Sequence, residues 1–262
     1  PIPLTEVVGR KLYVTEFGKE IAQAAEKIIE EVNAINYKTL NYQGELSGRL
    51  KLSIVSTGKY VIPFFLSEFI KLNPGVELII DVTNRSRVLE SLESNEVDFA
   101  LVSVLPKKLK VKNIELMQNS LYFIGSSQLN FEKPNNKKSL FENTPIIYRE
   151  QGSATRTAME KFITANKFSV RKKIELTSNE AVKQAVLSGL GCSIMPLIGI
   201  KNDLKNNDLQ IIPVKGLPII TTWNLIQLES KKLSPVALAY LDFVNSKKEA
   251  IIKEKFGWIN DY

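Results

Sequence analysis

Hydrophobic and polar positions along this chain follow the order expected of strands that lead into helices. The clearest case is GRLKLSIVSTGKY, residues 48–60, where an apolar run ends in small polar residues. Aliphatic and β-branched side chains in such a run suit a sheet that is buried on at least one face. Residues 59–72 then carry apolar side chains on one helical face and end at Asn73-Pro74-Gly75, a strong stop signal. The pattern predicts a strand followed by a helix.

The same order continues downstream and is repeated in the second half of the chain. A helix at 87–94 is predicted between strands at 76–82 and 97–104. This alternation predicts parallel strands joined by right-handed crossovers. Apolar runs at 114–126 and 222–228 are predicted to carry the chain to a second lobe and back. The predicted elements of that second lobe are strands at 145–148, 173–176, 191–195 and 209–214, and helices at 154–166 and 180–187.

Short polar motifs mark the ends of helices in the second half. Ser178 and Ser234 each stand where an N-cap is expected, and Ser234 opens a final helix predicted at 235–243. The motif Ser188-Gly189-Leu190-Gly191 precedes a strand instead of following one, so we interpret it as a helix stop and not as a phosphate loop. The tail from Lys247 onward is amphipathic, and its pattern predicts no definite element.

The N-terminal region has a different pattern. Two short apolar stretches around Gly9-Arg10-Lys11 predict a β-hairpin, and Thr15 is placed to cap a helix that runs from Glu16 to beyond Ile35. The apolar side chains of that helix recur in alternating steps of three and four, as in a two-helix coil. They are Phe17, Ile21, Ala24, Ile28, Val32 and Ile35. We expect this helix to pair with a second copy; packing of the stripe on the chain's own body is the alternative.

Charge and composition narrow the function. The 262 residues are 44% hydrophobic, which allows a large core and favours two domains, or one domain with an appendage. An excess of basic residues gives a formal charge of +7, which favours anionic partners. The chain has no histidine, so it lacks the commonest general base and the usual zinc ligand. We therefore expect no enzymatic activity, no metal and no cofactor.

The compartment is predicted from what the chain lacks. No apolar run has the length of a membrane span, and PIPLTEVVGRK does not have the charged-then-apolar order of a secretory signal. The single Cys192 cannot form an internal disulfide, and in an apolar strand it is expected to be a small buried side chain. These features predict a cytoplasmic protein with no membrane partner.

Two strand-to-helix junctions carry groups that could hold an anion. The segment STGK, 56–59, offers hydroxyls, backbone N–H groups and a lysine beyond the carboxyl end of its strand, where open α/β sheets receive ligands. The segment REQGSATR, 149–156, repeats this with two arginines that can bind phosphate or carboxylate oxygens. Each segment alone also fits an ordinary capped helix. Facing one another across two lobes, they would form one anion site.

These motifs resemble those of the LysR-type transcriptional regulators. PIPLTEVVGRKLYVTEFGKE is similar to the end of that family's winged helix, with a basic hairpin and a Leu-Thr-x-x-Gly motif in which Val14 replaces the leucine and Gly18 is kept. The stretches GRLKLSIVSTGKY, SNEAVKQAVLSGLG and KKLSPVALAYLDFV follow in family order. The resemblance is closest to the branch that regulates the carbon-fixation (RuBisCO) operon, through STGKY, REQGSATRTAMEKF, SNEAVKQAV and GLPIITTW.

The resemblance implies an α/β fold with two Rossmann-like lobes of periplasmic-binding-protein type II architecture, preceded by the end of a winged helix and a long dimerisation helix. Residues 1–15 would close the winged-helix domain, and residues 16–44 would form the linker helix and hinge. Residues 45–124 with 225–262 would form the first regulatory subdomain, and residues 125–224 the second.

The resemblance also implies a function. Such a regulator is a cytoplasmic homodimer or homotetramer that binds a small phosphorylated or carboxylated metabolite between its lobes and thereby reorients its DNA-binding domains. Promoter DNA would be bound through a helix-turn-helix that is largely missing from these residues, so we expect the chain as given not to read a DNA sequence alone. Arg10 and Lys11 in the wing would contact the DNA backbone, and RNA polymerase is a further partner that the family allows.

The expected effector contacts lie mostly at the two junctions. They are Ser56, Thr57, Gly58, Lys59, Ser103, Arg149, Gly152, Ser153, Thr155, Arg156, Asn179 and Pro196. Three alternatives stay open from the residues: a small-anion or solute-binding protein with no DNA role, an enzyme with two α/β lobes, and a purely structural dimer module.

Overall fold

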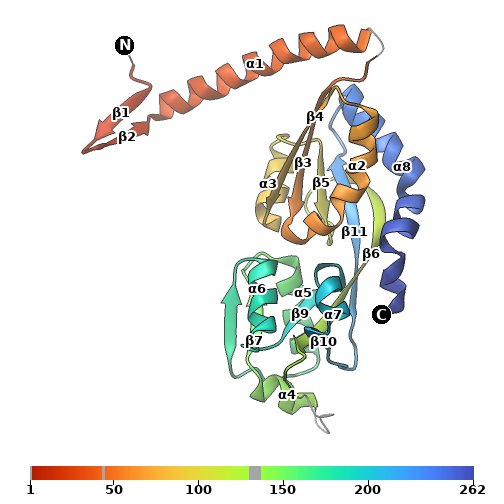
Figure 1. Ribbon diagram of the computed structural model, residues 1–262. Coiled ribbons are helices and arrows are strands. Elements are labelled where there is room, and N and C mark those ends of the chain that lie inside the picture. The colour runs from red at the N-terminus through yellow and green to blue at the C-terminus, as the bar shows by residue number, and fades with distance from the viewer. Residues whose placement is uncertain (1, 43–44, 130–136) are drawn as a thin grey trace.

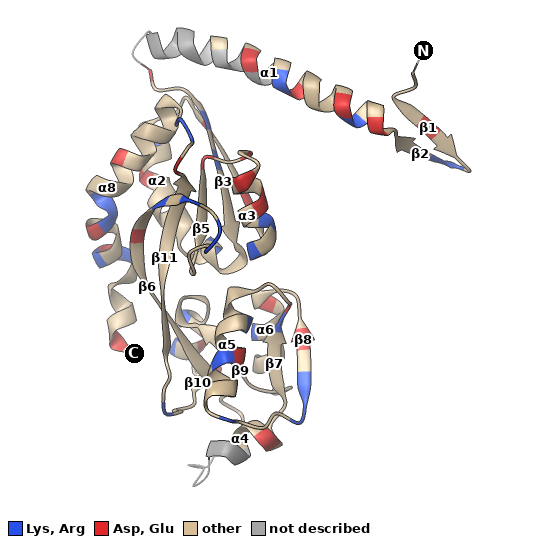
Figure 2. Ribbon diagram, turned by 180° about the vertical axis from the view of Figure 1, so that it is seen from behind, with Lys and Arg blue, Asp and Glu red and all other residues tan. Residues whose placement is uncertain are grey.

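The computed structural model describes residues 2–42, 45–129 and 137–262 of the chain. Within these ranges a β-hairpin and a long helix precede two lobes that lie one above the other in Figure 1. The hairpin pairs β1 (Thr5–Val8) with β2 (Lys11–Val14), and α1 runs over Glu16–Tyr42. Figures 1 and 2 both show α1 extending away from the lobes, and the hairpin tip carries the basic pair Arg10 and Lys11, blue in Figure 2.

The junction between hairpin and helix explains the spacing of Thr15 and Gly18 in physical terms. The Thr15 hydroxyl accepts a hydrogen bond from the Gly18 N–H at 2.9 Å and donates to the Pro3 carbonyl at 2.8 Å. A Cβ at Gly18 would overlap the Leu4 carbonyl oxygen. The predicted cap at Thr15 is therefore confirmed, and a glycine is required three residues later because hairpin and helix approach closely there.

The first lobe contains the predicted strand–helix alternation. β3 pairs in parallel with both of its sheet neighbours, β4 and β5, so the predicted parallel crossovers are confirmed. The prediction of one helix from residue 59 is wrong at its start. Residues 56–60 form a 3₁₀ turn, and the α-helix begins at Ile62, beside Pro63, which suits a first helical turn. The elements are β3 (Gly48–Val55), η1 (Ser56–Tyr60), α2 (Ile62–Leu72), β4 (Val76–Thr83), α3 (Arg85–Glu93) and β5 (Phe99–Val102).

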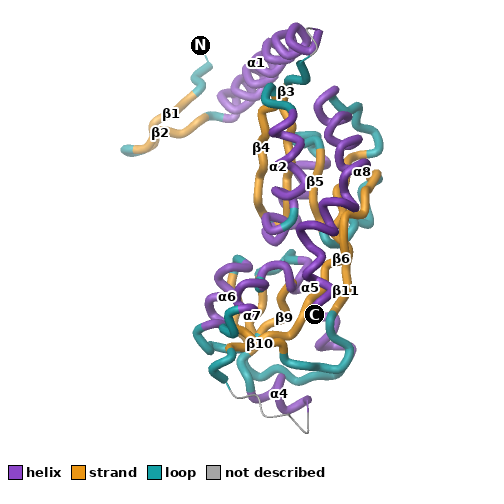
Figure 3. Tube along the Cα trace, turned by 45° about the vertical axis from the view of Figure 1, so that its right-hand side comes forward, coloured by secondary structure: helices purple, strands orange, loops and turns teal. Residues whose placement is uncertain are grey.

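Two long strands join the lobes. β6 (Val111–Ser126) and β11 (Ile219–Leu228) pair antiparallel along most of their length, with an irregularity between Trp223 and Asn224. Both strands continue from one lobe to the other in Figures 1 and 3. The seven-stranded sheet therefore spans both lobes, in the order β10-β6-β11-β5-β3-β4 with β9 also paired to β6. The two predicted crossings of the chain are confirmed. The predicted subdomain limits at 124/125 and 224/225 fall inside β6 and β11, and they remain a prediction.

The second lobe repeats the βαβ arrangement on a smaller scale. β7 and β8 pair in parallel across α5, and Ile146 bridges to Cys192 just before β9. Two short helices, α4 and α7, were not predicted. The elements are α4 (Lys137–Asn143), β7 (Ile146–Arg149), α5 (Ala154–Ala165), β8 (Lys173–Leu176), α6 (Asn179–Leu187), β9 (Ser193–Pro196), η2 (Leu197–Gly199), α7 (Lys201–Lys205) and β10 (Leu209–Ile211).

The predicted helix signals are present. The Ser178 hydroxyl accepts from the Ala181 N–H at 3.0 Å, and the Ser234 hydroxyl accepts from the Ala237 N–H at 3.2 Å. Gly189 has φ 78° just after α6, so it ends that helix as predicted. The last helix, α8, covers Pro235–Phe256 and is followed by a 3₁₀ turn, η3 (Gly257–Asp261). The predicted end at residue 243 is thus too early.

Each lobe has its own hydrophobic core. The first lobe buries Trp223 and Tyr240 among strands β3, β5 and β11 and helices α2 and α8. The second lobe buries two clusters, one around Phe123 and Phe141 and one around Ile147 and Val182. Cys192 is fully buried, and burial raises the pKa of its thiol to about 12, so it is a packing residue as predicted.

None of the helices in the described ranges combines the length and the apolarity that a bilayer crossing needs. Among the same residues no cluster of three or more His, Cys, Asp or Glu side chains is placed to hold a metal ion.

Candidate anion site between the lobes

The two predicted junctions face one another across the lobes. Side chains from η1 in the first lobe and from the start of α5 in the second line one small cavity of about 20 Å³. The predicted effector residues among its lining are Ser56, Thr57, Ser103, Arg149, Ser153 and Thr155. A cavity of this size holds about one water molecule, so a metabolite would need the lobes to move apart.

The hydroxyl groups of the cavity are available to a ligand. Thr57 and Ser153 are each only 6% exposed, yet within the described residues neither hydroxyl has a hydrogen-bond partner in the protein. Ser153 is the N-cap residue of α5, but its side chain makes no cap hydrogen bond. The Thr157 hydroxyl instead donates to the Ser153 carbonyl at 3.1 Å.

The start of α5 adds backbone donors. Ser153, Ala154 and Thr155 line the cavity, and α5 is 12 residues long. The first N–H groups of an α-helix have no partner within the helix, and the aligned peptide dipoles make that end positive. This is the usual arrangement for binding a phosphate or a carboxylate.

Arg149 brings a neutralised charge to the cavity. The residue is 5% exposed, and its Nε and Nη2 atoms donate to the two carboxylate oxygens of Glu150 at 2.7 and 2.8 Å. This fork satisfies two of the guanidinium's donors and cancels its charge locally. Arg149 therefore contributes geometry more than net positive potential.

Arg85 is a lining residue that sequence reasoning missed. It is the first residue of α3, after the N-cap Asn84, whose side chain accepts from the Arg87 N–H at 3.0 Å. The Arg85 guanidinium donates to the carbonyl oxygens of Val104 and Leu105 over long distances, 3.4 and 3.5 Å, and its buried Nε has no partner among the described residues. Burial lowers the pKa of this guanidinium, and no carboxylate of the described residues offsets that effect. The sequence feature that could have identified Arg85 is the TNRSR stretch, residues 83–87, which follows the predicted strand 76–82 and forms a third strand-to-helix junction of the same kind.

The other predicted residues lie outside the small cavity. Gly58 is packed in the first core, where a Cβ would come within 2.9 Å of a Leu101 methyl group. Lys59 is exposed, with its Nζ 5.1 Å from the centre of the Tyr60 ring. Gly152 lines a larger neighbouring cleft, and Pro196 is buried at the end of β9, paired with Leu121.

Arg156 has partners of its own. Its Nη1 donates to Glu175 at 2.6 Å and to the Arg149 carbonyl at 2.9 Å, and its Nε donates to Glu160 at 2.8 Å. Hydrogen bonds from the guanidinium to Glu160 and Glu175 raise the pKa of Arg156. The guanidinium thus braces α5 against β8, and it does not line the cavity.

Asn179 lies at a direct contact between the lobes. Asn179 is 1% exposed and lies beside Tyr60 and Gly199. A Cβ added at Gly199 would come within 3.0 Å of the Asn179 Nδ2. The Tyr60 hydroxyl donates to Glu180 at 3.3 Å, and burial raises the pKa of Tyr60. Asn179 lines neither the small cavity nor the larger cleft, and its expected contact with an effector stays a prediction.

Comparisons with known proteins agree with this architecture. The profile of the family described as the LysR substrate binding domain matches residues 43–248. The HTH-type transcriptional activator CmpR of Synechocystis sp. is 36% identical over 95% of this chain and 83% of its own length. The RuBisCO operon transcriptional regulator of Allochromatium vinosum is 34% identical over 94% of this chain and 82% of its own length. The solved regulatory domain of Synechocystis CcmR in complex with 2-PG is 31% identical, with a TM-score of 0.72, covering 78% of this chain and 98% of that domain.

Proposed function

Because this chain belongs to the LysR family of transcriptional regulators, we propose that it senses a small phosphorylated anion held between its two lobes. The observation that carries the proposal is the convergence on one cavity of hydroxyls from both lobes, of the start of α5, and of Arg85, whose buried Nε has no partner among the described residues. The CcmR domain, which shares the fold at 31% identity, was solved with 2-PG, an anion of this class.

The mechanism we infer is a population shift. The cavity of about 20 Å³ is too small for such an anion, so binding favours an arrangement in which the lobes are farther apart or rotated. A useful response needs the ligand to discriminate between the two arrangements by about 1 to 3 kcal/mol. β6 and β11 connect the lobes continuously, so a change in their twist would be the route of the movement.

The assembly and the DNA contact belong to the same proposal. The exposed apolar stripe of α1 would pair two chains as a homodimer, or as half of a homotetramer, and Arg10 and Lys11 would meet the DNA backbone. Effector binding would change how far apart the DNA-binding domains of the dimer stand. Such a protein acts in the cytoplasm on promoter DNA and carries out no reaction of its own; its named relatives are regulators of transcription.

Calorimetric titration with 2-PG tests the proposal. Thr57→Val keeps the shape of the side chain and removes one unpaired hydroxyl, so we expect the Kd to rise about 10-fold or more, as for a lost hydrogen bond to a charged group. Thr164→Val, on the exposed face of α5, is the matched control and should bind as the parent chain does. Equal affinity of all three chains, or no binding of any phosphorylated anion, would contradict the assignment.

A further inference from the structure

A group of lysines covers the end of the second lobe that lies far from the hairpin. They are Lys167, Lys172, Lys173 and Lys215, and all four are exposed. Figure 2 shows Lys and Arg in blue at this end of the lobe, along the lower part of β8 and in the loop that precedes β11. We call these four residues the distal lysine surface.

The second core brings the two segments of this surface together. Residues 167–173 are held by Phe168, whose ring centre lies 5.9 Å from that of Phe162. The loop 213–218 meets the same ring, because a Cβ at Gly216 would come within 3.3 Å of it. Both segments therefore cover the same part of the core, and their lysines are exposed on one end of the lobe.

The positive charge of this surface is not balanced within the described part of the lobe. Among the described residues of 137–218, every carboxylate except that of Asp208 is in an ion pair with an arginine or with Lys183. Arg171, in the same segment as three of the four lysines, is itself paired with Glu142. The lysines of the distal surface form no ion pair with these residues. A group of uncompensated cations attracts an anionic partner.

The composition of the surface indicates which kind of anion it fits. In residues 160–176 and 213–218 no large hydrophobic side chain is exposed. Stable protein–protein interfaces rely on buried aromatic and apolar anchors, and they are depleted in lysine. Contacts to a nucleic-acid backbone rely on lysine and arginine charges spread over an extended surface. Separate lysines without apolar anchors therefore fit a row of phosphates better than an acidic protein.

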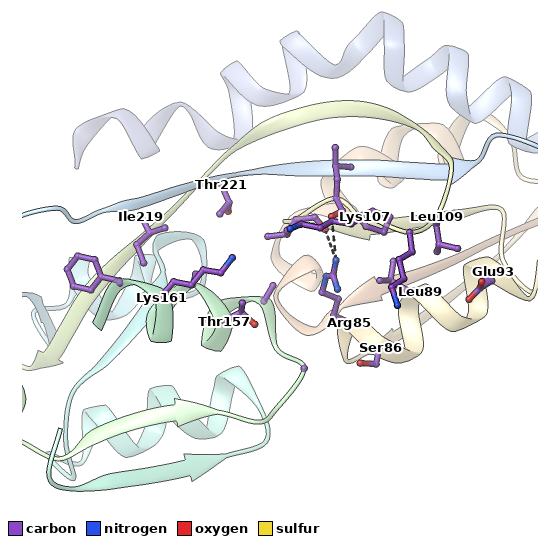
Figure 4. A pocket seen from close by; sticks show the side chains of 18 residues that line it. Arg85, Ser86, Leu89, Glu93, Lys107, Leu109, Thr157, Lys161, Ile219 and Thr221 are labelled. Atoms are coloured by element: carbon purple, nitrogen blue, oxygen red, sulfur yellow. Dashed lines mark hydrogen bonds between the residues drawn. The ribbon is translucent and has the colours of Figure 1, made fainter. Parts of the chain in front are cut away.

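The distal lysine surface is separate from the site between the lobes. A wide cleft of about 940 Å³ lies between α3 and α5 and shares Arg85 and Ala154 with the small cavity, so it belongs to the site already described. Figure 4 shows Lys161 extending from α5 toward the first lobe in this cleft. Lys161 is therefore not a member of the distal surface, and none of the four distal lysines lines the cleft or the small cavity.

We propose that the distal lysine surface binds the phosphate backbone of double-stranded DNA, independently of the base sequence. Double-stranded DNA is the polyanion that a transcriptional regulator meets, and this contact adds to the one expected of Arg10 and Lys11 in the wing. It holds the second lobe against the duplex by charge alone, so it weakens steeply as salt is added. The proposal does not depend on which anion the small cavity binds.

Fluorescence anisotropy of a labelled duplex of arbitrary sequence, titrated with the 262-residue chain over a salt series, tests this inference. The variant Lys172→Glu with Lys215→Glu reverses two charges of the surface at exposed positions, so it should fold. We expect its Kd at about 50 mM salt to rise at least 10-fold, and the slope of log Kd against log salt to fall by about 2, because each phosphate contact contributes about 0.9. Lys173 is kept, since its Nζ also lies 5.7 Å from the centre of the Tyr148 ring.

The matched control is Lys71→Glu with Lys232→Glu. Both of these lysines are exposed in the first lobe, and the net charge falls by the same amount. This variant should keep the salt slope of the parent chain, and its Kd should rise less than threefold. A parent chain that does not bind the duplex, or equal Kd values and slopes for the two double variants, would overturn the proposal. Polyglutamate binding that is lost in Lys172→Glu with Lys215→Glu, while duplex binding is unchanged, would assign the surface to an acidic protein instead.

A second measurement uses the unaltered chain. Acetylation of lysine amines, followed by mass spectrometry, reports which lysines the bound duplex covers. A saturating concentration of the duplex should slow the modification of Lys172 and Lys215 several-fold and leave the rates at Lys71 and Lys232 unchanged. Rates at Lys172 and Lys215 that do not change when the duplex is added would show that the DNA does not lie on this surface.

Discussion

At the scale of single residues, the cations around the small cavity are not equivalent. Glu150 neutralises Arg149, and Glu160 with Glu175 neutralises Arg156. Arg85 has no carboxylate partner among the described residues and meets only carbonyl oxygens at long distance. A bound anion would therefore gain most from Arg85, because a charge that is already paired adds little attraction.

This difference predicts the effects of two arginine substitutions on anion binding. Arg85→Gln should raise the Kd for 2-PG about 10-fold or more, since it removes a charged donor of a partly buried site. Arg156→Gln, which removes a guanidinium held by two carboxylates, should change the Kd less than threefold. Calorimetric titration of both variants measures this. A larger loss in Arg156→Gln than in Arg85→Gln would return the anion contact to the residue that the sequence motif indicated.

Glycines provide a second prediction at this scale. A Cβ at Gly191 would overlap the Pro145 carbonyl oxygen, which accepts a hydrogen bond from the Cys192 N–H at 2.9 Å. Gly191→Ala should therefore lower the free energy of unfolding by about 1 to 3 kcal/mol. Gly257→Ala is the control, because nothing lies within 4 Å of its Cβ and its φ of −53° suits any residue. Urea denaturation measures both, and an unchanged stability of Gly191→Ala would mean that β7 and β9 can separate freely.

At the scale of elements, α1 has an apolar stripe whose described residues are left exposed by the rest of the chain. Ile21, Ile28 and Val32 are 42%, 65% and 53% exposed, so the alternative in which this stripe packs on the body of the chain does not describe these three residues. Exposed large apolar side chains in a narrow helical stripe are typical of a helix that pairs with another.

Pairing through α1 has a direct test. Ile28→Asp puts a carboxylate into the middle of the stripe, and we expect the dimer to dissociate at concentrations at least 10-fold higher than for the parent chain. Gln23→Asp adds the same carboxylate to the same helix away from the stripe and should leave the assembly unchanged. Sedimentation velocity over a concentration series measures both. A parent chain that stays monomeric, or equal dissociation of both variants, would exclude this helix as the interface.

At the scale of the whole molecule, the C-terminal end connects both lobes. α8 packs on the first core, and its extension η3 reaches the second lobe. There the Lys201 Nζ lies 4.5 Å from the centre of the Trp258 ring, and the Tyr122 hydroxyl donates to the Tyr262 carbonyl at 2.8 Å. Figure 3 shows α8 alongside β6 and β11, which also run between the lobes. A movement of one lobe against the other must therefore alter the surroundings of Trp258.

The tryptophans can report that movement. We expect saturating 2-PG to change the emission intensity or wavelength of the parent chain. The other tryptophan, Trp223, is fully buried in the first core on β11, so Trp258→Phe should remove the part of the change that arises at the contact of η3 with the second lobe, while 2-PG still binds. Steady-state fluorescence with parallel calorimetry measures both quantities. An equally large change in Trp258→Phe would mean that the contact between η3 and the second lobe does not alter when 2-PG binds.

The predicted elements agree with the observed ones where the hydrophobic pattern along the chain is regular. The parallel order of β3, β4 and β5 and the two crossings by β6 and β11 follow from long apolar runs separated by stop signals, and these were predicted. The far end of α8 was not predicted beyond Phe243. Its buried side chains, such as Ile251 and Phe256, are widely spaced among lysines, and they are covered by groups from distant parts of the chain.

The candidate site was predicted in part for a similar reason. Ser56, Thr57, Ser153 and Thr155 follow strands directly, so the rule for ligand sites in α/β sheets locates them. Which arginine is left unpaired depends on the positions of carboxylates that are near in space and not always near in sequence, such as Glu175 for Arg156. The wide cleft between α3 and α5 depends on how far the lobes stand apart, which no local pattern reports.

The amino-acid order of this chain was sufficient for most of its strands and helices, its two-lobed α/β class and the positions of the two junctions, because each of these depends on spacing along the backbone; its motifs carried the resemblance to the family. The folded arrangement was needed for the unpaired Arg85, the closed small cavity and the open cleft beside it. These three features arise from pairings and distances between residues of different lobes, and such pairings are set when the lobes pack and not by any neighbouring residues in the chain.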